Sequence, residues 1–191
     1  MMDFLVREAR AVVVGEMVMC RLGTCGSVGV EPNVVVANTS GSVWVSRNSD
    51  AFLQDGDENP YVVSKVVEPD EGLARALSAA LEKHVGSVKE GLNASTDSFY
   101  CSQGRIDPNF DDKNADFLNM IPKEVISMDM ESFQLLHMAK SCTLPIAAAT
   151  GAIVCADRVS GKVIAAEDLH ATEALCGKAV LEAVAHYNVT A

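Results

Sequence analysis

Hydrophobic positions follow two spacings along the chain, one typical of helices and one typical of strands. Residues 1–13 gather their polar side chains on one face, which predicts an amphipathic helix. A second helix is predicted to begin after Asp70, a favourable N-cap, and to end near Gly86, with its leucines three or four residues apart. Further helices are predicted over residues 114–122, 131–141 and 167–186.

Short runs rich in β-branched residues lie between these helices and predict strands. They cover residues 16–22, 34–37, 42–46, 62–67, 125–130 and 144–154, with one more strand inside 88–96, while 48–60 and 97–112 read as irregular. Several runs are continuously apolar, which indicates strands covered on both faces. The alternation predicts an α/β fold with a mixed or mostly parallel sheet, in a single domain spanning residues 1–191.

The composition excludes several classes of protein. The 191 residues carry 15 Lys and Arg against 26 Asp and Glu, a net charge of −11, which speaks against nucleic acid or an anionic membrane surface as partner. No apolar stretch is long enough to span a bilayer, and acidic residues stand where a signal peptide is basic. The six cysteines have no metal-finger spacing, so we expect a reduced, cytoplasmic protein without a bound metal.

The first motif that could carry chemistry is Arg21-Leu-Gly-Thr-Cys-Gly26, at the end of a predicted strand. A buried arginine is costly unless an anion or a carboxylate meets it. The predicted glycine-rich turn offers backbone N–H groups and the Thr24 hydroxyl at the same place, a combination that suits an oxyanion such as phosphate. A structural turn in which Arg21 pairs with an internal acid explains these residues equally well.

The second motif joins an aromatic pair, Phe99 and Tyr100, to Gln103 and Arg105. A glutamine amide donates and accepts hydrogen bonds and a guanidinium only donates, so together they can read the edge of a planar heterocycle. One of the aromatic rings could stack on its face. The alternative is an ordered surface loop with an ion pair between Arg105 and Asp107.

The third motif is Met128-Asp-Met-Glu-Ser132, where a predicted strand meets a helix. A carboxylate at this place is stabilised by the helix dipole, so Asp129 can be a cap or a helix-start charge. Glu131 could instead hold the vicinal hydroxyls of a sugar with both of its carboxylate oxygens. Capping is the commoner role of such a carboxylate.

In this order, the three motifs resemble those of the nucleoside phosphorylase superfamily, and most closely those of the eukaryotic-type uridine phosphorylases. Residues 21–26 are similar to the family's phosphate motif, which Val28-Gly-Val-Glu-Pro32 continues in eukaryotic style. The segment from Ser98 to Arg105 is similar to the uracil-recognition segment. Residues 128–132 are similar to the ribose motif, with Asp129 where glutamate is commoner.

The resemblance implies a three-layer α/β fold around a mixed, distorted sheet, and reversible phosphorolysis of uridine to uracil and ribose 1-phosphate. It implies phosphate as co-substrate, no metal or organic cofactor, and a homodimer or higher homo-oligomer, because the family's sites are shared between subunits. The implied catalytic residues are Arg21, Arg105 and Glu131; the phosphate ligands are Arg21 and Thr24; the base contacts are Gly26, Phe99, Gln103, Arg105, Ile153 and Val154; and the ribose contacts are Met130 and Glu131.

Two departures from the family pattern add further hypotheses. Asp157-Arg158 stands where uridine-specific members often have Asn-Arg, and purine phosphorylases place a proton-donating aspartate nearby. Asp157 therefore either broadens the specificity toward purines or pairs with Arg158. The family's first strand and its glycine loop, whose arginine completes the phosphate site, do not precede Met1. The resemblance thus predicts an N-terminally truncated fold with an exposed sheet edge and weak or absent catalysis, or a non-catalytic nucleoside-binding protein.

Overall fold

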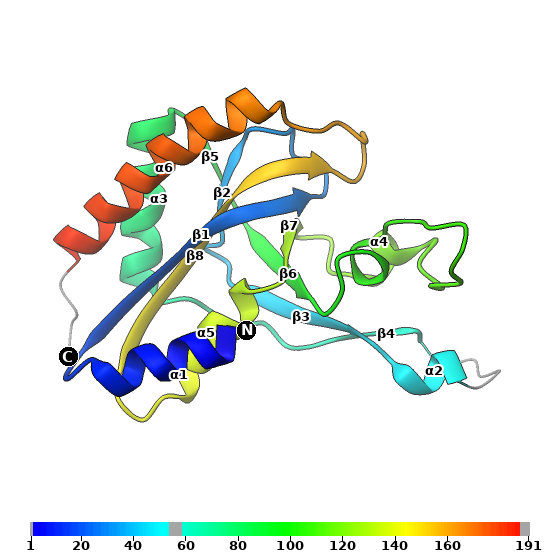
Figure 1. Cartoon of the computed structure of the whole chain (residues 1–191), viewed down its shortest axis with the longest axis horizontal. Coiled ribbons are helices and arrows are strands. Elements are labelled where there is room, and N and C mark those ends of the chain that lie inside the picture. Colours follow the sequence, from blue (N-terminus) through cyan, green and yellow to red (C-terminus); the bar gives the residue numbers. More distant parts are fainter. Residues whose placement is uncertain (1, 54–58, 188–191) are drawn as a thin grey trace.

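The structure, a computed structural model, describes residues 2–53 and 59–187. A mixed eight-stranded sheet with the order β4-β3-β6-β7-β1-β8-β2-β5 forms its centre (Figure 1). The strands are β1 (Met17–Ser27), β2 (Val35–Ala37), β3 (Ser42–Arg47), β4 (Tyr61–Val63), β5 (Val88–Glu90), β6 (Leu92–Thr96), β7 (Val125–Asp129) and β8 (Ile146–Asp157). The helices are α1 (Met2–Val12), α2 (Ser49–Leu53), α3 (Glu71–Val85), α4 (Phe117–Met120), α5 (Ser132–Ser141) and α6 (Ala166–His186), with a 3₁₀ turn η1 (Cys101–Gln103).

The side chains of β8 sort the helices into two layers. Ala147, Ala149 and Ile153 pack into a buried cluster with α3 and α6. Ile146 and Ala148 point to the other face, where they pack with α1 and α5. Figure 1 shows α3 and α6 above β1 and β8 and the other two helices below. This alternation, which follows from the period of a strand, confirms the expected three-layer α/β fold.

Helix α3 begins and ends where the sequence predicts. The Asp70 carboxylate accepts a hydrogen bond from the Leu73 N–H at 2.8 Å, and Gly86 ends the helix with a φ of 86°, a conformation that favours glycine. The Tyr187 hydroxyl donates to the same Asp70 carboxylate at 2.6 Å, which ties the segment after α6 to the start of α3. Burial and this contact raise the pKa of Tyr187 to about 12.

Strand β1 runs straight through the residues expected to form a glycine-rich turn. It pairs in parallel with β8 along its whole length, with one irregularity between Cys25 and Gly26. Arg21 therefore lies in the middle of the strand and not at its end. The prediction of a turn from residue 23 was wrong because β8, distant in sequence, supplies the pairing that glycine-rich residues do not favour by themselves.

The other strand boundaries differ in smaller ways. The expected strand within 88–96 is two strands separated by Gly91, where a Cβ atom would come within 2.7 Å of Ile126. β5 then pairs with β2, while β6 pairs with β3 and β7. Helix α2 occupies part of the segment 48–60 expected to be a loop, of which residues 54–58 lie outside the described ranges.

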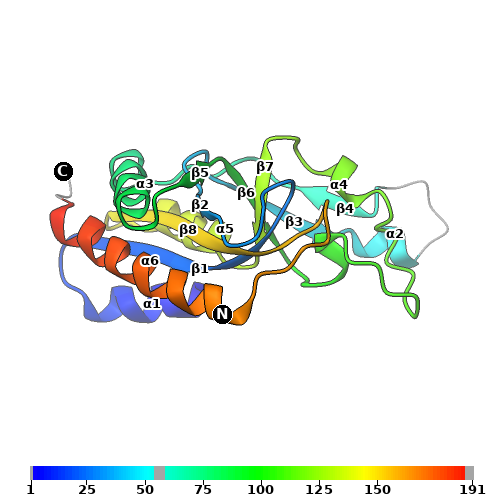
Figure 2. The same cartoon turned by 90° about the horizontal axis from the view of Figure 1, so that it is seen from above.

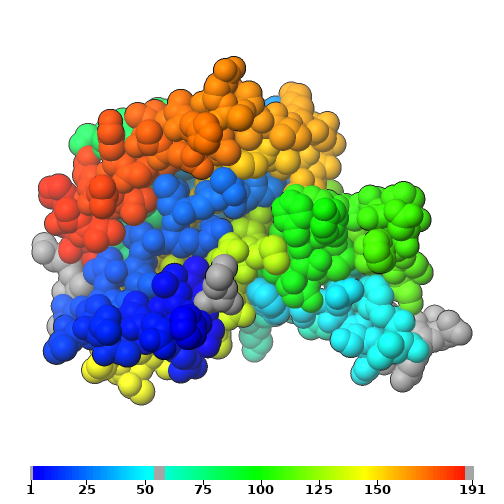
Figure 3. Space-filling view, in the orientation of Figure 1, coloured from blue at the N-terminus to red at the C-terminus, as the bar shows by residue number. Residues whose placement is uncertain are grey.

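One edge of β1 is open. β7 pairs with β1 only at Gly26 and Ser27, so no strand in the described ranges pairs with residues 17–25 on the side away from β8. In the view from above, β1 is followed by β8, β2 and β5 from the bottom of the picture toward its top (Figure 2). The space-filling view shows β1 in blue between α6 and α1 (Figure 3). The exposed sheet edge expected from the sequence is therefore present along residues 17–25 of β1.

None of the helices in the described ranges is long and apolar enough to cross a lipid bilayer.

Candidate active site

A cleft of about 700 Å³ opens where β1, β7 and β8 meet the segment around Gln103. This volume suits a small-molecule ligand. Figure 3 shows the region hollowed between β1, the surface that follows β8 and the green surface near residue 100. The lining combines all three motifs with the end of β8, and its residues are Arg21, Gly23, Thr24, Cys25, Gly26, Phe99, Gln103, Arg105, Met128, Asp129, Met130, Glu131, Cys155, Ala156, Arg158 and Val163.

Arg21 lies between two carboxylates at one end of the cleft. Its Nη1 is 2.8 Å from Asp129 Oδ2, and its Nη2 is 2.5 Å from Glu131 Oε2. The guanidinium lies over Gly23, where a Cβ atom would come within 2.8 Å of Nη2. The pairing with an internal acid, one of the two explanations of this motif, is thus present. The glycine leaves room for the cation.

Asp129 is the fixed member of this group. Its side chain is 1% exposed, and it accepts hydrogen bonds from Ser95 Oγ at 2.6 Å, from Ser132 Oγ, and from the Ser132 N–H at 3.3 Å. The last contact satisfies a backbone donor at the start of α5, as expected of a helix-start carboxylate. A buried charge is tolerated when it is paired and hydrogen-bonded in this way.

Glu131 has more freedom. Its side chain is 36% exposed, and it makes no capping hydrogen bond to α5 although it occupies the N-cap position. Its carboxylate faces the cleft, where it meets Arg21. Of the two roles considered for this motif, Asp129 has the contact to the start of α5, and Glu131 is the carboxylate that faces the cleft.

Gln103 forms the other end of the cleft and is fixed in orientation. It is 2% exposed, its Nε2 donates to Thr96 Oγ1 at 3.1 Å, and its Oε1 accepts from Arg105 Nη1 at 2.8 Å. Gly104 turns the chain between the two side chains with a φ of 66°, in the region that favours glycine. The turn brings the amide and the guanidinium to the same side of the loop.

Arg105 stacks on the Phe99 ring, with its Cζ 3.5 Å from the ring centroid, and also donates to the Phe99 carbonyl. Burial, and secondly the nearby Arg158 charge, lower the pKa of Arg105 to about 10. The alternative of an Arg105–Asp107 ion pair is wrong, because no such pair occurs in the described part of the chain. Of the aromatic pair, only Phe99 lines the cleft, whereas Tyr100 lines a neighbouring cavity.

Arg158 is a cleft residue that the sequence reasoning did not select. Its Nη2 lies 3.4 Å from Gln103 Oε1, and burial lowers the pKa of its guanidinium. A Cβ atom at Gly26 would come within 2.7 Å of the same nitrogen. Gly26 therefore gives space to this arginine. The available signal was a cation directly after a buried strand, the same signal that drew attention to Arg21.

Asp157 turns away from the cleft. Its carboxylate accepts hydrogen bonds from the N–H groups of Gly29 at 2.8 Å, Ser160 at 2.9 Å and Val159 at 3.3 Å. Burial would raise its pKa, but these hydrogen bonds, with Ser160 the strongest influence, lower it to about 2. The expected ion pair between Asp157 and Arg158 does not form. Asp157 instead stabilises the turn after β8.

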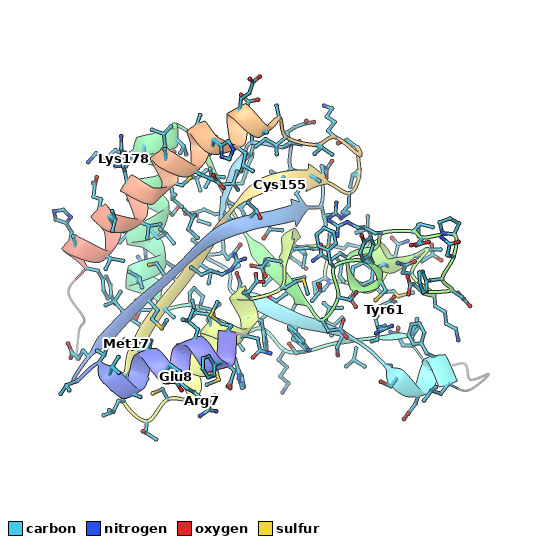
Figure 4. All side chains as sticks on the ribbon, in the orientation of Figure 1. Arg7, Glu8, Met17, Tyr61, Cys155 and Lys178 are labelled. Atoms are coloured by element: carbon cyan, nitrogen blue, oxygen red, sulfur yellow. The ribbon has the colours of Figure 1, made fainter. Side chains whose placement is uncertain are left out.

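Ile153 and Val154 are not in the lining, in contrast to the expectation from the resemblance. Ile153 packs under α3 and α6, and Val154 packs beside Cys25. β8 reaches the cleft only with its next two residues, Cys155, labelled in Figure 4, and Ala156. The physical reason is that strand side chains alternate between faces, and at 153 and 154 both faces are still covered.

The cleft can hold an oxyanion near Arg21, a diol near Glu131 and a planar ring near Gln103 and Arg105. The Thr24 hydroxyl lies close to the Cys155 thiol, whose pKa is raised mainly by burial. No cluster of three or more His, Cys, Asp or Glu side chains with metal-binding geometry occurs among residues 2–53 and 59–187.

Comparisons with known proteins agree with the fold. No curated protein sequence matches the chain significantly. A solved uridine phosphorylase of the oomycete Phytophthora capsici is similar, with a TM-score of 0.90 and 37% identity, over 98% of this chain and 73% of that one. A Trypanosoma brucei nucleoside phosphorylase that shows uridine phosphorylase activity shares the fold, with a TM-score of 0.65 and 19% identity, over 89% of this chain and 64% of that one. The family model of the phosphorylase superfamily matches residues 1–187, so the chain belongs to the phosphorylase superfamily.

Proposed function

We propose that the chain catalyses reversible phosphorolysis of uridine to uracil and ribose 1-phosphate. The observation that carries the proposal is the single cleft that joins Arg21 and Glu131 to Gln103 and Arg105. The Phytophthora capsici uridine phosphorylase, 37% identical, supports pyrimidine nucleosides as the substrate class.

In this proposal the Arg21 end of the cleft binds phosphate and the ribose, and the Gln103 end binds the base. Arg21 and Thr24 hold phosphate, and Glu131 with Met130 holds the ribose hydroxyls. Phosphate attacks the anomeric carbon while the glycosidic bond breaks, and that bond's electron pair leaves on uracil. Holding phosphate under the ribose gives it a high effective concentration.

The base end stabilises the charge that develops on uracil. A pKa of about 10 leaves Arg105 protonated at neutral pH, so it can only donate hydrogen bonds to the departing anion. Phe99 would line the base pocket directly. Gly26 would contribute to the pocket by giving room to Arg158. No metal or organic cofactor is needed for this chemistry.

The position of Asp157 favours uridine over purine nucleosides. A purine-type role requires an aspartate that offers a proton in the cleft, whereas this carboxylate is engaged by Gly29, Val159 and Ser160. Its low pKa keeps it ionised at neutral pH, unable to donate a proton.

A nucleoside-binding protein without turnover is the second candidate. It is favoured by the charge balance at Arg21, whose cation already faces two carboxylates and has less attraction left for phosphate.

Phosphate-dependent loss of uridine absorbance in the purified chain tests both candidates, with inosine and phosphate-free samples as controls. We expect uracil release only with uridine and phosphate together, and an Arg105→Gln variant to lower kcat by about 10²–10³-fold. Arg47→Gln, in the neighbouring cavity, is the matched control and should keep the wild-type rate. Uridine binding without any release would favour the second candidate, and release from inosine alone would contradict the substrate assignment.

The proposal includes a homodimer or higher homo-oligomer in the cytoplasm, for which light scattering should give at least twice the mass of one chain. A monomer mass at working concentration would contradict that part.

A further inference from the structure

The two ion pairs of Arg21 are unequal. Nη1 is paired with Asp129, whose side chain is 1% exposed and held by Ser95 and Ser132. Nη2 is paired with Glu131, whose side chain is 36% exposed and has no capping hydrogen bond. One contact is therefore built into the sheet, while the other can be exchanged without disturbing the backbone.

The exchangeable contact lies where both proposed ligands must bind. An oxyanion in the cleft needs the Nη2 donor, since Nη1 is buried against Asp129. A sugar diol held by both carboxylate oxygens needs Glu131 Oε2, the atom that lies 2.5 Å from that Nη2. Either ligand alone must separate the same two groups. The second ligand then meets a partner that is already free.

We propose that the Arg21–Glu131 contact couples the oxyanion and nucleoside sites, so that each ligand strengthens the binding of the other. The inference rests on the proposed function, because it takes the diol and the oxyanion as the two ligands. Asp129 keeps Arg21 in place while Nη2 changes partner. Coupling of this kind is reciprocal, and we expect it to change each Kd by about fivefold or more.

Calorimetric titration of the whole chain tests the coupling, with uridine as the nucleoside and inorganic sulfate as an oxyanion that does not react. Saturating sulfate should lower the Kd of uridine by about fivefold or more, and uridine should lower the Kd of sulfate by the same factor. A uridine Kd in the wild type that does not depend on sulfate would overturn the inference while leaving the proposed function intact.

The Glu131→Gln variant distinguishes two roles of Glu131: competing with the oxyanion for Arg21 Nη2, or contacting the sugar alone. The variant keeps the size of the side chain and removes its charge, so sulfate loses a competitor for Nη2. We expect tighter sulfate binding and a uridine Kd that no longer responds to sulfate. If Glu131 served the sugar alone, the Kd of sulfate would not change.

Glu173→Gln is the matched control for charge. Glu173 is close enough to Cys155 to affect its pKa, but it contacts His170 and not Arg21. We expect wild-type coupling in this variant, and equal tightening of sulfate in both variants would overturn the exchange. If uridine fails to bind under every condition, the proposed function fails, whereas the sulfate Kd of Glu131→Gln still decides whether Arg21 exchanges partners.

Discussion

The two ends of the β1–β8 pair share one ladder of backbone hydrogen bonds, but their side chains have different roles. At the helix-covered end, from Met17 and Ile146, apolar side chains alternate between two helical layers. At the cleft end, near Gly23–Ser27, glycines stand beside guanidinium groups that lie across the strand. Because backbone pairing with β8 continues along the whole strand, its side-chain positions can serve either to pack against helices or to line the cleft.

The contrast teaches that the cleft end is built by leaving space. Gly23 makes room for Arg21, and Gly26 makes room for Arg158. A helix-covered position gains stability from the apolar surface it buries. A glycine beside the cleft gives up that gain, and a cation lies in the space that it leaves.

The largest expected effect lies at the buried ion pair. Asp129→Ala leaves the Arg21 charge without its fixed partner, so the free energy of unfolding should fall by about 3–5 kcal/mol in urea titrations. Asp3→Ala breaks the exposed pair with Arg7 and should cost less than about 1 kcal/mol. Similar small losses in both variants would contradict the burial of the site pair.

Ile153→Ala tests the boundary between the two ends. The residue is 1% exposed in the helix-covered cluster, so we expect a loss of about 2–5 kcal/mol in the free energy of unfolding and an unchanged KM for uridine. Val163→Ala, in the cleft lining at 72% exposure, should leave the stability nearly unchanged. A raised KM with intact stability in Ile153→Ala would support the sequence-based assignment of this residue to the base pocket.

Asp157→Asn tests how the turn beside the cleft is held. The native pKa of about 2 lies below the ordinary value of 3.8, so ionised Asp157 contributes about 2 kcal/mol of stability. A depressed carboxyl pKa gives stability that is present above pH 4 and is lost as the pH falls through 2. The difference between wild type and variant should be constant from pH 5 to 7 and shrink below pH 4. A constant difference down to pH 2 would contradict this assignment.

The smallest effect is expected for Gly26→Ala. The new Cβ would come within 2.7 Å of Arg158 Nη2 and force the guanidinium to shift, at a cost of about 1 kcal/mol, so the Kd of uridine should rise by roughly 2–10-fold. Gly177→Ala adds a methyl group in α6 where nothing lies within 4 Å, and it should leave that Kd unchanged. Equal Kd values in the two variants would show that Gly26 does not give room to Arg158.

The sequence predicts the helix-covered end better than the cleft end. Regular apolar spacing is a local signal, and it places α3 with both of its caps. The three motifs also identify most of the cleft lining, because each residue type has few chemical uses. These parts depend on neighbours within a few residues of the chain.

The remainder depends on partners far apart in sequence. Gly23–Ser27 becomes a strand because β8 pairs with it, and nothing local favours that outcome. Arg158 follows Asp157 directly, so a pair between them is the simplest sequence reading. The turn after β8 instead supplies backbone N–H groups to the carboxylate and leaves the arginine to the cleft.

The open edge of β1 has a consequence for hydrogen exchange. Successive amides of a strand point to opposite sides, and along residues 17–25 only the side toward β8 has a strand partner. Every second amide there should exchange its hydrogen quickly, while the amides between them stay protected by β8. β8 itself, paired on one side with β1 and over part of its length with β2, should show a protected run with no such alternation where both neighbours bond it.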